Sequence, residues 1–161
     1  MQAIIKSHNN RIITTTTPAI PKKMCNCRDK DSCPLRGKCL TTALVYKATV
    51  SGCGVEPKTY IGISGGPFKQ RYYNHRKSFN HQKHAKDTEL SKYIWALKEE
   101  EKSFEIKWEI LKTSNTKQRA SSQCNLCVEE KVEITLANNM NLLNRRTELL
   151  SKCRHSSKPK R

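Results

Sequence analysis

The chain carries five polar side chains whose chemistry suits hydrolysis of a phosphodiester, and these are Tyr46, Tyr60, Arg71, His75 and Glu130. Such a reaction needs an aligned water, a group that removes its proton, and positive charge that neutralises the developing anion. Phenol and imidazole groups transfer protons, a guanidinium binds phosphate through paired N–H donors, and a carboxylate holds a divalent cation. Arg71 and His75 are four positions apart, so a helix would present both on one face.

A cysteine-rich segment near the start of the chain predicts a structural zinc site. Four thiolates suffice for one tetrahedral zinc ion, and the candidates are Cys25, Cys27, Cys33 and Cys39. Residues 25–39 hold many turn formers and few other apolar residues, so the segment needs a metal to become ordered. His81 and His84 are alternative ligands for this site, although the simpler interpretation places both in a solvated loop.

A second zinc site is predicted from three further cysteines and a histidine, which are Cys124, Cys127, Cys153 and His155. This site would join the start of a helix to the end of the chain. Cys127 precedes Glu130 by about one helical turn, so zinc there would fix the position of that carboxylate. Cys53 lies between two glycines without an obvious partner and is expected to be a free thiol.

Several motifs resemble those of the GIY-YIG endonucleases. They are Leu-Val-Tyr at 44–46, Tyr-Ile-Gly at 60–62, the Arg71 and His75 pair, Glu130 and Asn144, and together they cover residues 43 to 146. Leu44 and Val45 stand where the family name has Gly and Ile. The words Cys-Pro-Leu-Arg-Gly-Lys-Cys, Phe-Lys-Gln-Arg, Leu-Ser-Lys-Tyr-Ile-Trp and Cys-Asn-Leu-Cys-Val-Glu-Glu-Lys are similar to the GIY-YIG domains carried by Penelope-like retroelements.

The resemblance implies a DNA endonuclease, or nickase, that leaves a 5′-phosphate and a 3′-hydroxyl. Its partners would be DNA and, on a larger retrotransposon polypeptide, the element's RNA and a reverse transcriptase. Two alternatives remain open from the residues alone. One is a catalytically inactive, zinc-stabilised nucleic-acid-binding module, and the other is a structure-specific repair nuclease acting on branched DNA.

The resemblance also assigns roles to the site residues. Glu130 would hold the catalytic Mg²⁺ or Mn²⁺, and Tyr46 would act as the general base. Tyr60 would position the water or share its proton, Arg71 would bind the scissile phosphate, and His75 would orient phosphate or assist proton transfer. Asn144 would support the site through hydrogen bonds.

The apolar pattern predicts the elements that must position these side chains. Strands are expected at 43–50, 59–63 and 104–110, with the first two forming a hairpin. Helices are expected at 68–79, 88–101 and 123–137, and residues 142–150 should close the chain against the core. We therefore predict an α/β fold, a small three-stranded antiparallel sheet flanked by helices, GIY-YIG nuclease-like, with the catalytic cluster on one exposed face of the sheet.

The charge of the chain predicts a polyanionic partner. Lys and Arg number 31 against 14 Asp and Glu, a net charge of +17. Residues 1–86 carry 16 basic and 3 acidic side chains, while residues 87–161 carry 15 and 11. The first half is therefore expected to face the phosphates.

The chain divides into a flexible basic arm or linker at 1–24, a zinc-binding segment at 25–42, a nuclease-like domain at 43–155 and a basic tail at 156–161. No apolar stretch reaches the roughly 20 residues that span a bilayer, so no membrane partner is expected. Ligand-like cysteine clusters favour a reducing compartment. We expect an intracellular protein that works on DNA in the nucleus.

Overall fold

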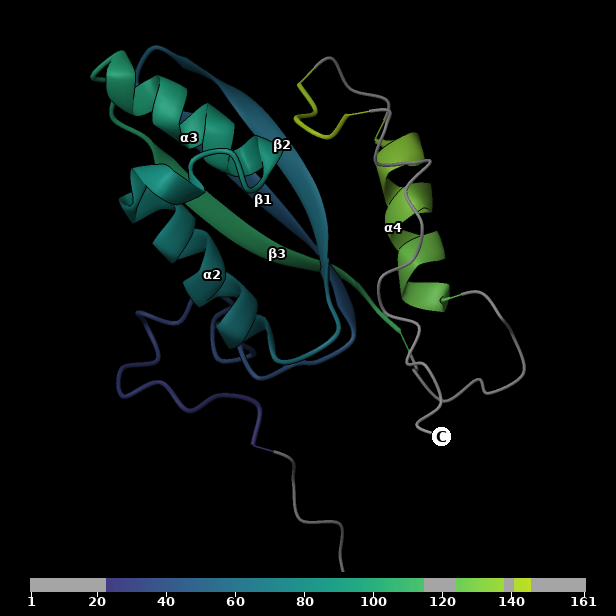
Figure 1. The fold of residues 1–161 in the computed structure, drawn as a ribbon. Helices are drawn as coiled ribbons and strands as arrows, with labels where there is room; N and C mark the ends of the chain where they lie inside the picture. Colours follow the sequence, from purple (N-terminus) through teal and green to yellow (C-terminus); the bar gives the residue numbers. More distant parts are fainter. Residues whose placement is uncertain (1–22, 115–123, 138–140, 146–161) are drawn as a thin grey trace, which may run out of the picture.

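A three-stranded antiparallel sheet forms the centre of the computed structural model, which describes residues 23–114, 124–137 and 141–145 (Figure 1). Its strands lie in the order β2-β1-β3. Their bounds are Leu44–Gly52 for β1, Val55–Ser64 for β2 and Glu105–Thr113 for β3. The predicted three-stranded antiparallel sheet is therefore confirmed, and β1, its middle strand, is buried along most of its length.

The β1–β2 hairpin decides which tyrosines share a face of the sheet. Gly54 has φ +68°, a conformation that side chains rarely adopt, and allows the tight turn between the strands. In the resulting register Tyr46 pairs with Gly62, and Ala48 pairs with Tyr60. Tyr46 and Tyr60 are thus diagonal neighbours on one face, close enough for aromatic side chains to reach a common site.

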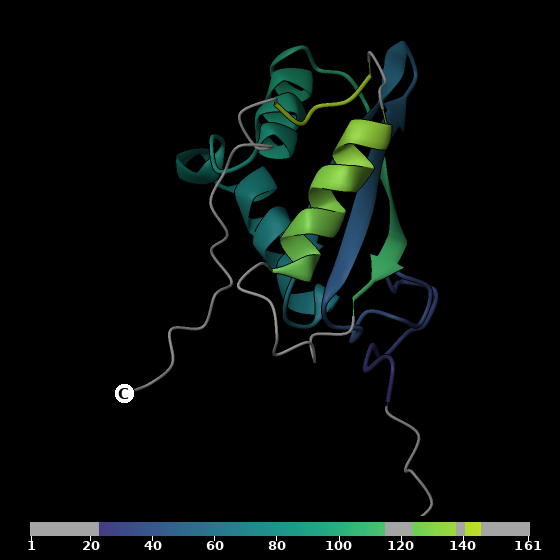
Figure 2. The ribbon, with the colours of Figure 1, turned by 90° about the vertical axis from the view of Figure 1, so that its right-hand side faces the viewer.

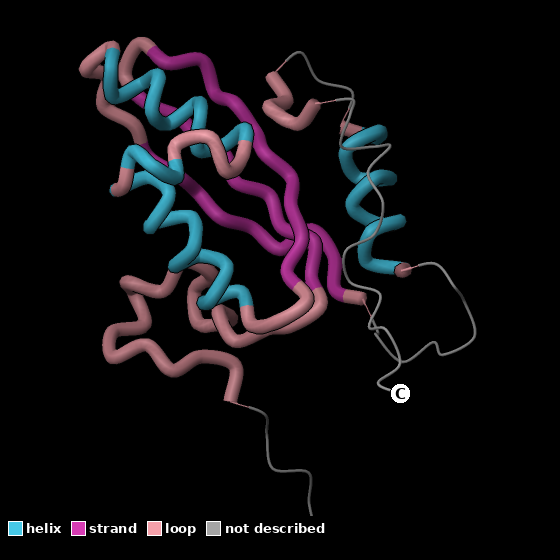
Figure 3. The backbone as a smooth tube through the Cα atoms, in the orientation of Figure 1, coloured by secondary structure: helices cyan, strands magenta, loops and turns pink. Residues whose placement is uncertain are grey.

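Two helices cover the face that carries the tyrosines: α2 (Phe68–Asn80) and α3 (Glu89–Glu99), joined through the short 3-10 helix η1 (Gln82–His84) (Figure 3). Thr88 caps the N-terminus of helix α3, because its side chain accepts a hydrogen bond from the Ser91 backbone N–H at 3.0 Å. Between these helices and the sheet lies the larger core, which includes Phe68, Leu90, Ile94 and Trp108.

The opposite face of the sheet is covered by α4 (Asn125–Leu136), which crosses in front of β1 in Figure 2. Leu126 and Ile134 of this helix are buried against Val45 and Ile61, the residues of β1 and β2 that alternate with the tyrosines. The fold therefore has three layers, with the sheet between α2 and α3 on one side and α4 on the other. None of the described helices is long and apolar enough to cross a bilayer.

The outer edge of β2 is covered by residues 141–144. The Thr59 N–H donates to the Asn141 carbonyl at 2.9 Å, and the Leu143 N–H donates to the Thr59 carbonyl at 2.8 Å. These bonds form a short parallel bridge centred on Thr59 and Leu142. Part of the predicted closing segment, 142–145, thus lies against the sheet, while 146–150 lies outside the described residues.

Observed and predicted elements differ mainly at their ends. The strands β2 and β3 extend beyond the predicted 59–63 and 104–110, because backbone pairing with β1 continues past the apolar positions that marked them. Helix α2 ends one residue later than predicted, and α3 ends at Glu99 rather than near Glu101. Glu101 itself has φ +53°, outside helical geometry.

Candidate active site and metal centre

The hydroxyl of Tyr46 lies at the centre of a buried hydrogen-bonded network. It is 2.7 Å from Nε2 of His75 and accepts a hydrogen bond from Nε of Arg71 at 3.1 Å. Tyr46 is fully buried and His75 is 2 % exposed. Arg71 and His75 are one turn apart on α2, as their spacing predicted, and both reach the same phenol.

The donors and acceptors in this network can be assigned from simple chemistry. A guanidinium only donates, so the Tyr46 oxygen accepts from Arg71 and its single proton is left for His75. Burial, with the nearby Arg71 charge, lowers the pKa of His75 to about 3, so the ring is neutral at physiological pH. Nε2 of His75 is therefore the acceptor, and the network runs from guanidinium through phenol to imidazole.

Gly62 makes room for this phenol. A Cβ at position 62 would lie 2.6 Å from the hydroxyl oxygen of Tyr46 and 2.8 Å from Cζ, closer than Cβ contacts allow. Gly62 belongs to the Tyr-Ile-Gly motif and pairs directly with Tyr46 across the hairpin. In the sequence this glycine is only one member of a motif, whereas the structure shows a steric reason for it.

Aromatic rings enclose the His75 imidazole. Its ring centroid is 5.3 Å from that of Trp108 and 5.9 Å from that of Phe79, which stacks on it. These rings exclude water, which is why burial dominates the pKa shift of His75. Trp108 lies within the strand expected at 104–110, and its contact with His75 was not foreseen from the sequence.

Tyr60 and Arg71 complete the cluster on the tyrosine face of the sheet. Tyr60 is 6 % exposed, and its ring centroid is 6.1 Å from that of His75. Burial by itself would lower the pKa of Arg71, but interactions with Tyr46 and Tyr60 outweigh it and raise that pKa. The structure therefore brings Tyr46, Tyr60, Arg71 and His75 together around one permanent positive charge.

This cluster is less open than the sequence suggested. We predicted it on an exposed face of the sheet, but α2 packs directly over that face and leaves Tyr46 and His75 almost inaccessible. Packing of Phe68 and Phe79 on α2 against the sheet forces this arrangement. The expectation of an exposed face was therefore wrong.

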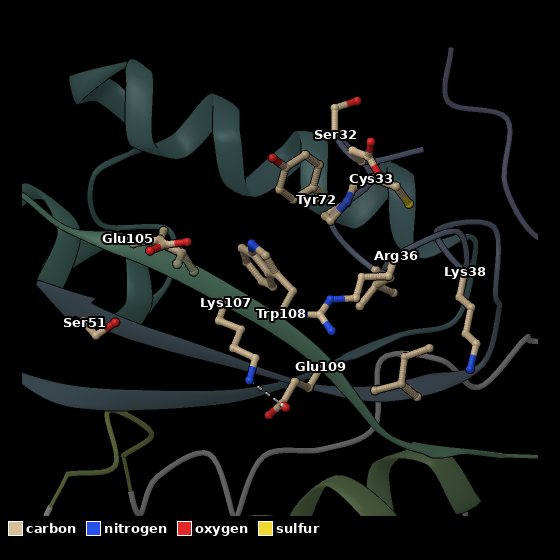
Figure 4. A pocket seen from close by; sticks show the side chains of 15 residues that line it. Ser32, Cys33, Arg36, Lys38, Ser51, Tyr72, Glu105, Lys107, Trp108 and Glu109 are labelled. Atoms are coloured by element: carbon tan, nitrogen blue, oxygen red, sulfur yellow. Dashed lines mark ion pairs between the residues drawn. The ribbon is translucent and has the colours of Figure 1, made fainter. Parts of the chain in front are cut away.

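A groove of about 840 Å³ lies beside the buried network, between the cysteine-rich loop and β3 (Figure 4). Tyr72 and Trp108 form part of its wall, together with basic and acidic side chains such as Arg36 and Glu105. Since Trp108 also contacts the His75 ring, the indole separates this groove from the network.

Glu130 comes from the other layer of the fold, on α4. It lies four residues after Leu126 and four before Ile134, so it shares their sheet-facing side of the helix, and it is half-buried. Its neighbour Glu129 points elsewhere, toward Nζ of Lys112 on β3 at 3.8 Å. The two adjacent glutamates therefore have different surroundings.

Asn144 binds β2 through both ends of its side-chain amide. Its Oδ1 accepts from the Ile61 N–H and its Nδ2 donates to the Ile61 carbonyl, each at 2.8 Å. Ile61 directly follows Tyr60, so this pair of bonds fixes the strand beside the second tyrosine. The side-chain amide of Asn144 thus binds the backbone of β2 at Ile61 and holds the two segments together.

The four N-terminal cysteines form a group whose geometry fits a tetrahedral metal ion. Their ligand atoms all lie within 4.8 Å of one another, with Sγ separations of 3.7 Å for Cys25 to Cys33, 3.7 Å for Cys27 to Cys39 and 3.5 Å for Cys25 to Cys39. A tetrahedral Zn²⁺ with Zn–S bonds of about 2.3 Å needs sulfur atoms about 3.8 Å apart. The observed set matches this requirement, and these cysteines could hold a structural metal ion such as zinc.

Local backbone geometry prepares the thiols for a metal. Arg36 and Gly37 both have positive φ, which turns the chain so that backbone N–H groups of residues 35 and 37 reach the Cys33 sulfur. Although burial opposes it, these donors lower the pKa of Cys33 to about 7. Burial raises the pKa of Cys39 to about 12, so a cation is what would keep this thiol ionised.

The cysteine loop is joined to the start of α2. The N–H groups of Phe68 and Lys69 donate to the carbonyls of Thr41 and Cys39 at 3.0 and 2.7 Å, and Leu35 of the loop is buried in the larger core. The loop therefore fixes the helix that carries Arg71 and His75. The cysteine-rich loop is thus connected to the polar cluster through the first turn of α2.

The other predicted zinc ligands are not part of this four-cysteine group. His81 and His84 are not members of the four-cysteine group, and Nδ1 of His84 is 3.0 Å from the Asp87 carboxylate. Cys124 and Cys127 lie at the start of α4, but Cys153 and His155 lie outside the described residues, so the second zinc site stays a prediction. Cys53 is exposed in the hairpin turn and forms no disulfide.

The chain was also compared with known proteins. No protein family, curated protein or solved structure matches it.

Proposed function

We propose that the chain is a metal-dependent DNA endonuclease of the GIY-YIG type, a nickase belonging to a Penelope-like retroelement. The observation that carries the proposal is the buried network in which Tyr46 lies between Arg71 and His75. A phenol with a permanent cation on one side and a neutral imidazole acceptor on the other is suited to giving up its proton.

In this proposal each residue of the cluster has one task. Nε of Arg71 is engaged with Tyr46, so its terminal nitrogens bind the scissile phosphate and neutralise charge in the transition state. His75 accepts the hydrogen bond of the Tyr46 hydroxyl and orients it, while the positive charge of Arg71 favours the phenolate form in which Tyr46 can act as the general base. Tyr60, the more exposed tyrosine, positions the attacking water.

Glu130 is the proposed ligand for a divalent cation such as Mg²⁺ or Mn²⁺. One carboxylate is enough in principle, because Mg²⁺ keeps most of its waters and takes further ligands from substrate phosphate. The metal would supply charge stabilisation and a more acidic water. Half-burial of Glu130 on the sheet-facing side of α4 agrees with a ligand held in one orientation.

The charge around the cluster supports DNA as the substrate. No acidic residue occurs between Glu56 and Asp87, a stretch that includes the second half of β2 and all of α2. Arg71 therefore lies in a segment without carboxylates that would repel phosphate. The net charge of +17 points the same way.

Burial of the network favours a second candidate function, a zinc-stabilised nucleic-acid-binding module without catalysis. A fully buried Tyr46 hydroxyl has no direct access to a water nucleophile. In that case the hydrogen bonds of Tyr46 stabilise the fold and nothing more. The two functions therefore differ in the role of the Tyr46 hydroxyl: in the nuclease it takes part in cleavage, and in the binding module it only stabilises the fold.

A nicking assay with Tyr46→Phe separates them. We expect the wild type to nick supercoiled plasmid in Mg²⁺ and the variant to lose about a hundredfold or more of that rate, the range for a lost proton-transfer group. Tyr93→Phe is the matched control, since Tyr93 lies on α3 beneath the ammonium of Lys58 and outside the cluster. Nicking by folded Tyr46→Phe at the wild-type rate would contradict the proposal.

A further inference from the structure

The side of α2 that faces away from the sheet carries a stripe of polar and basic residues. Five positions follow one another at helical spacing, and we call them the α2 outer face: Lys69, Tyr73, Arg76, Lys77 and Asn80. All but Lys69, which is half-buried, are exposed. The helix contains no acidic residue, so nothing on it neutralises these cations.

An aromatic ring lies in the middle of this stripe. Tyr73 is 55 % exposed, which is unusual for so large a side chain next to a well-packed core. Its ring is 6.2 Å from that of Tyr72, which in turn stacks on the buried Phe68. Tyr73 is therefore presented to solvent from a rigid base and does not contribute its full area to the fold.

The N-terminus of α2 is not itself the source of anion binding. The first two N–H groups of the helix already donate to the carbonyls of Thr41 and Cys39. Lys69 is also partly engaged, since its Nζ donates to Oδ1 of Asn26 in the cysteine-rich loop at 2.7 Å. Contacts with a polyanion would therefore come from side chains along the helix, mainly Arg76 and Lys77.

We propose that the α2 outer face binds a single-stranded segment of DNA, with Arg76, Lys77 and Lys69 on phosphates and one base stacked on Tyr73. Basic side chains alone would bind the phosphates of single-stranded and duplex DNA alike. Stacking on the Tyr73 ring requires a base whose face is accessible, and in a duplex each base is covered by its neighbours. Stacking platforms flanked by positive charge are typical of single-strand binding. This inference rests on the proposed function in so far as it makes DNA the ligand.

The α2 outer face lies on a different side of the helix from the buried cluster. Arg71 and Tyr73 are two positions apart on α2, and side chains at that spacing point to different sides of a helix. Arg71 accordingly contacts the buried Tyr46 hydroxyl, whereas Tyr73 is exposed to solvent. The outer face is therefore a binding surface separate from the cluster.

Binding is best measured without divalent metal, so that cutting plays no part. Fluorescence anisotropy would compare a single-stranded oligonucleotide with the same sequence as a duplex. We expect Tyr73→Leu to weaken single-strand binding about tenfold and to leave duplex binding nearly unchanged, with Tyr73→Phe close to wild type because it keeps the ring. Equal affinity of Tyr73→Leu and wild type for the single strand would overturn the proposal.

The basic residues are tested with a charge-matched pair of variants. Arg76→Gln/Lys77→Gln removes two cations from the face, and Lys102→Gln/Lys107→Gln removes two exposed cations elsewhere. The first should reduce the slope of log affinity against log salt by about 1.4 for a single strand, whereas the second should change it little. Equal slopes for the two variants would also overturn the proposal.

The outcomes separate this inference from the proposed function. A wild type that shows these dependences but never nicks DNA would leave the binding face standing and refute the nuclease. A wild type that nicks DNA while Tyr73→Leu binds the single strand normally would do the reverse. Retained circular dichroism and zinc content of Tyr73→Leu exclude misfolding as the cause of any loss.

Discussion

Gly62 lies directly opposite Tyr46 in the β1–β2 pair, and a Cβ on it would come within 2.6 Å of the Tyr46 hydroxyl oxygen. Gly62→Ala should therefore displace the phenol from Arg71 and His75 and destabilise the fold by about 1–3 kcal/mol, as overpacking does in other cores. Chemical denaturation measures the loss. Gly66→Ala is the control, because its Cβ would meet only the tip of Gln70 at 3.9 Å. Equal stability of the two variants would show that Tyr46 has more room than the structure indicates.

The four-cysteine group should bind one zinc ion that stabilises the start of α2. We expect Cys39→Ser to lose about one equivalent of zinc and to unfold at lower temperature, because the loop has few other stabilising contacts. Zinc content and thermal melting are the measurements. Cys53→Ser should match wild type in both, since Cys53 is exposed in the hairpin turn. An unchanged zinc content in Cys39→Ser would rule out this site.

Neutral His75 should make the protein sensitive to acid. Its pKa is lowered from 6.5 to about 3 in the folded state, so between these values the unfolded chain binds the additional proton. Stability from this residue is fully present above about pH 6.5 and is lost as pH falls, by about 1.4 kcal/mol per unit.

The comparison that isolates His75 uses urea denaturation of wild type and His75→Gln between about pH 5.5 and about pH 7, in excess zinc. The pH dependence of the free energy of unfolding should be smaller in the variant, by about 0.9 proton near the acid end of this range and by about 0.2 proton near its neutral end. Parallel curves for the two proteins would mean that His75 is not buried in its neutral form.

Asn144 should hold residues 141–145 against the edge of β2. Replacing it with Ala removes both hydrogen bonds to Ile61 and leaves a backbone N–H and carbonyl without these partners. We expect a loss of about 2 kcal/mol in stability and faster hydrogen exchange at the Ile61 amide. Unchanged protection of that amide would indicate that the bonds to Asn144 do not persist in solution.

Much of the fold could be predicted because local patterns and the final environment agree. The alternating residues of β3 and the Thr88 cap of α3 are local signals, and the structure uses both. The helical spacing of Arg71 and His75 likewise placed two site residues on one face of α2. These features depend on the residue repeat within a single helix or strand and on its capping residue, and they do not depend on how helices and strands pack together.

What could not be predicted depends on packing between elements. Burial of Tyr46, the steric need for Gly62 and the contact of Trp108 with His75 all follow from the hairpin register and from α2 lying across the sheet. The position of Glu130 likewise depends on packing, because α4 lies on the face of the sheet that carries Val45 and Ile61. The exposure of Tyr73 could have been noticed from its place among basic residues at helical spacing, but only the packed helix shows which side is free.

The central claim is metal-dependent cleavage of DNA through Glu130, and the most direct measurement is nicking of supercoiled plasmid with and without Mg²⁺ by wild type, Glu130→Gln and Glu129→Gln. The two variants remove the same charge from adjacent positions of α4, and Glu129 faces Lys112 on β3. We predict Mg²⁺-dependent nicking by wild type and Glu129→Gln and its loss in Glu130→Gln. Nicking by Glu130→Gln at the wild-type rate, or no nicking by a wild type that binds DNA, would contradict the claim.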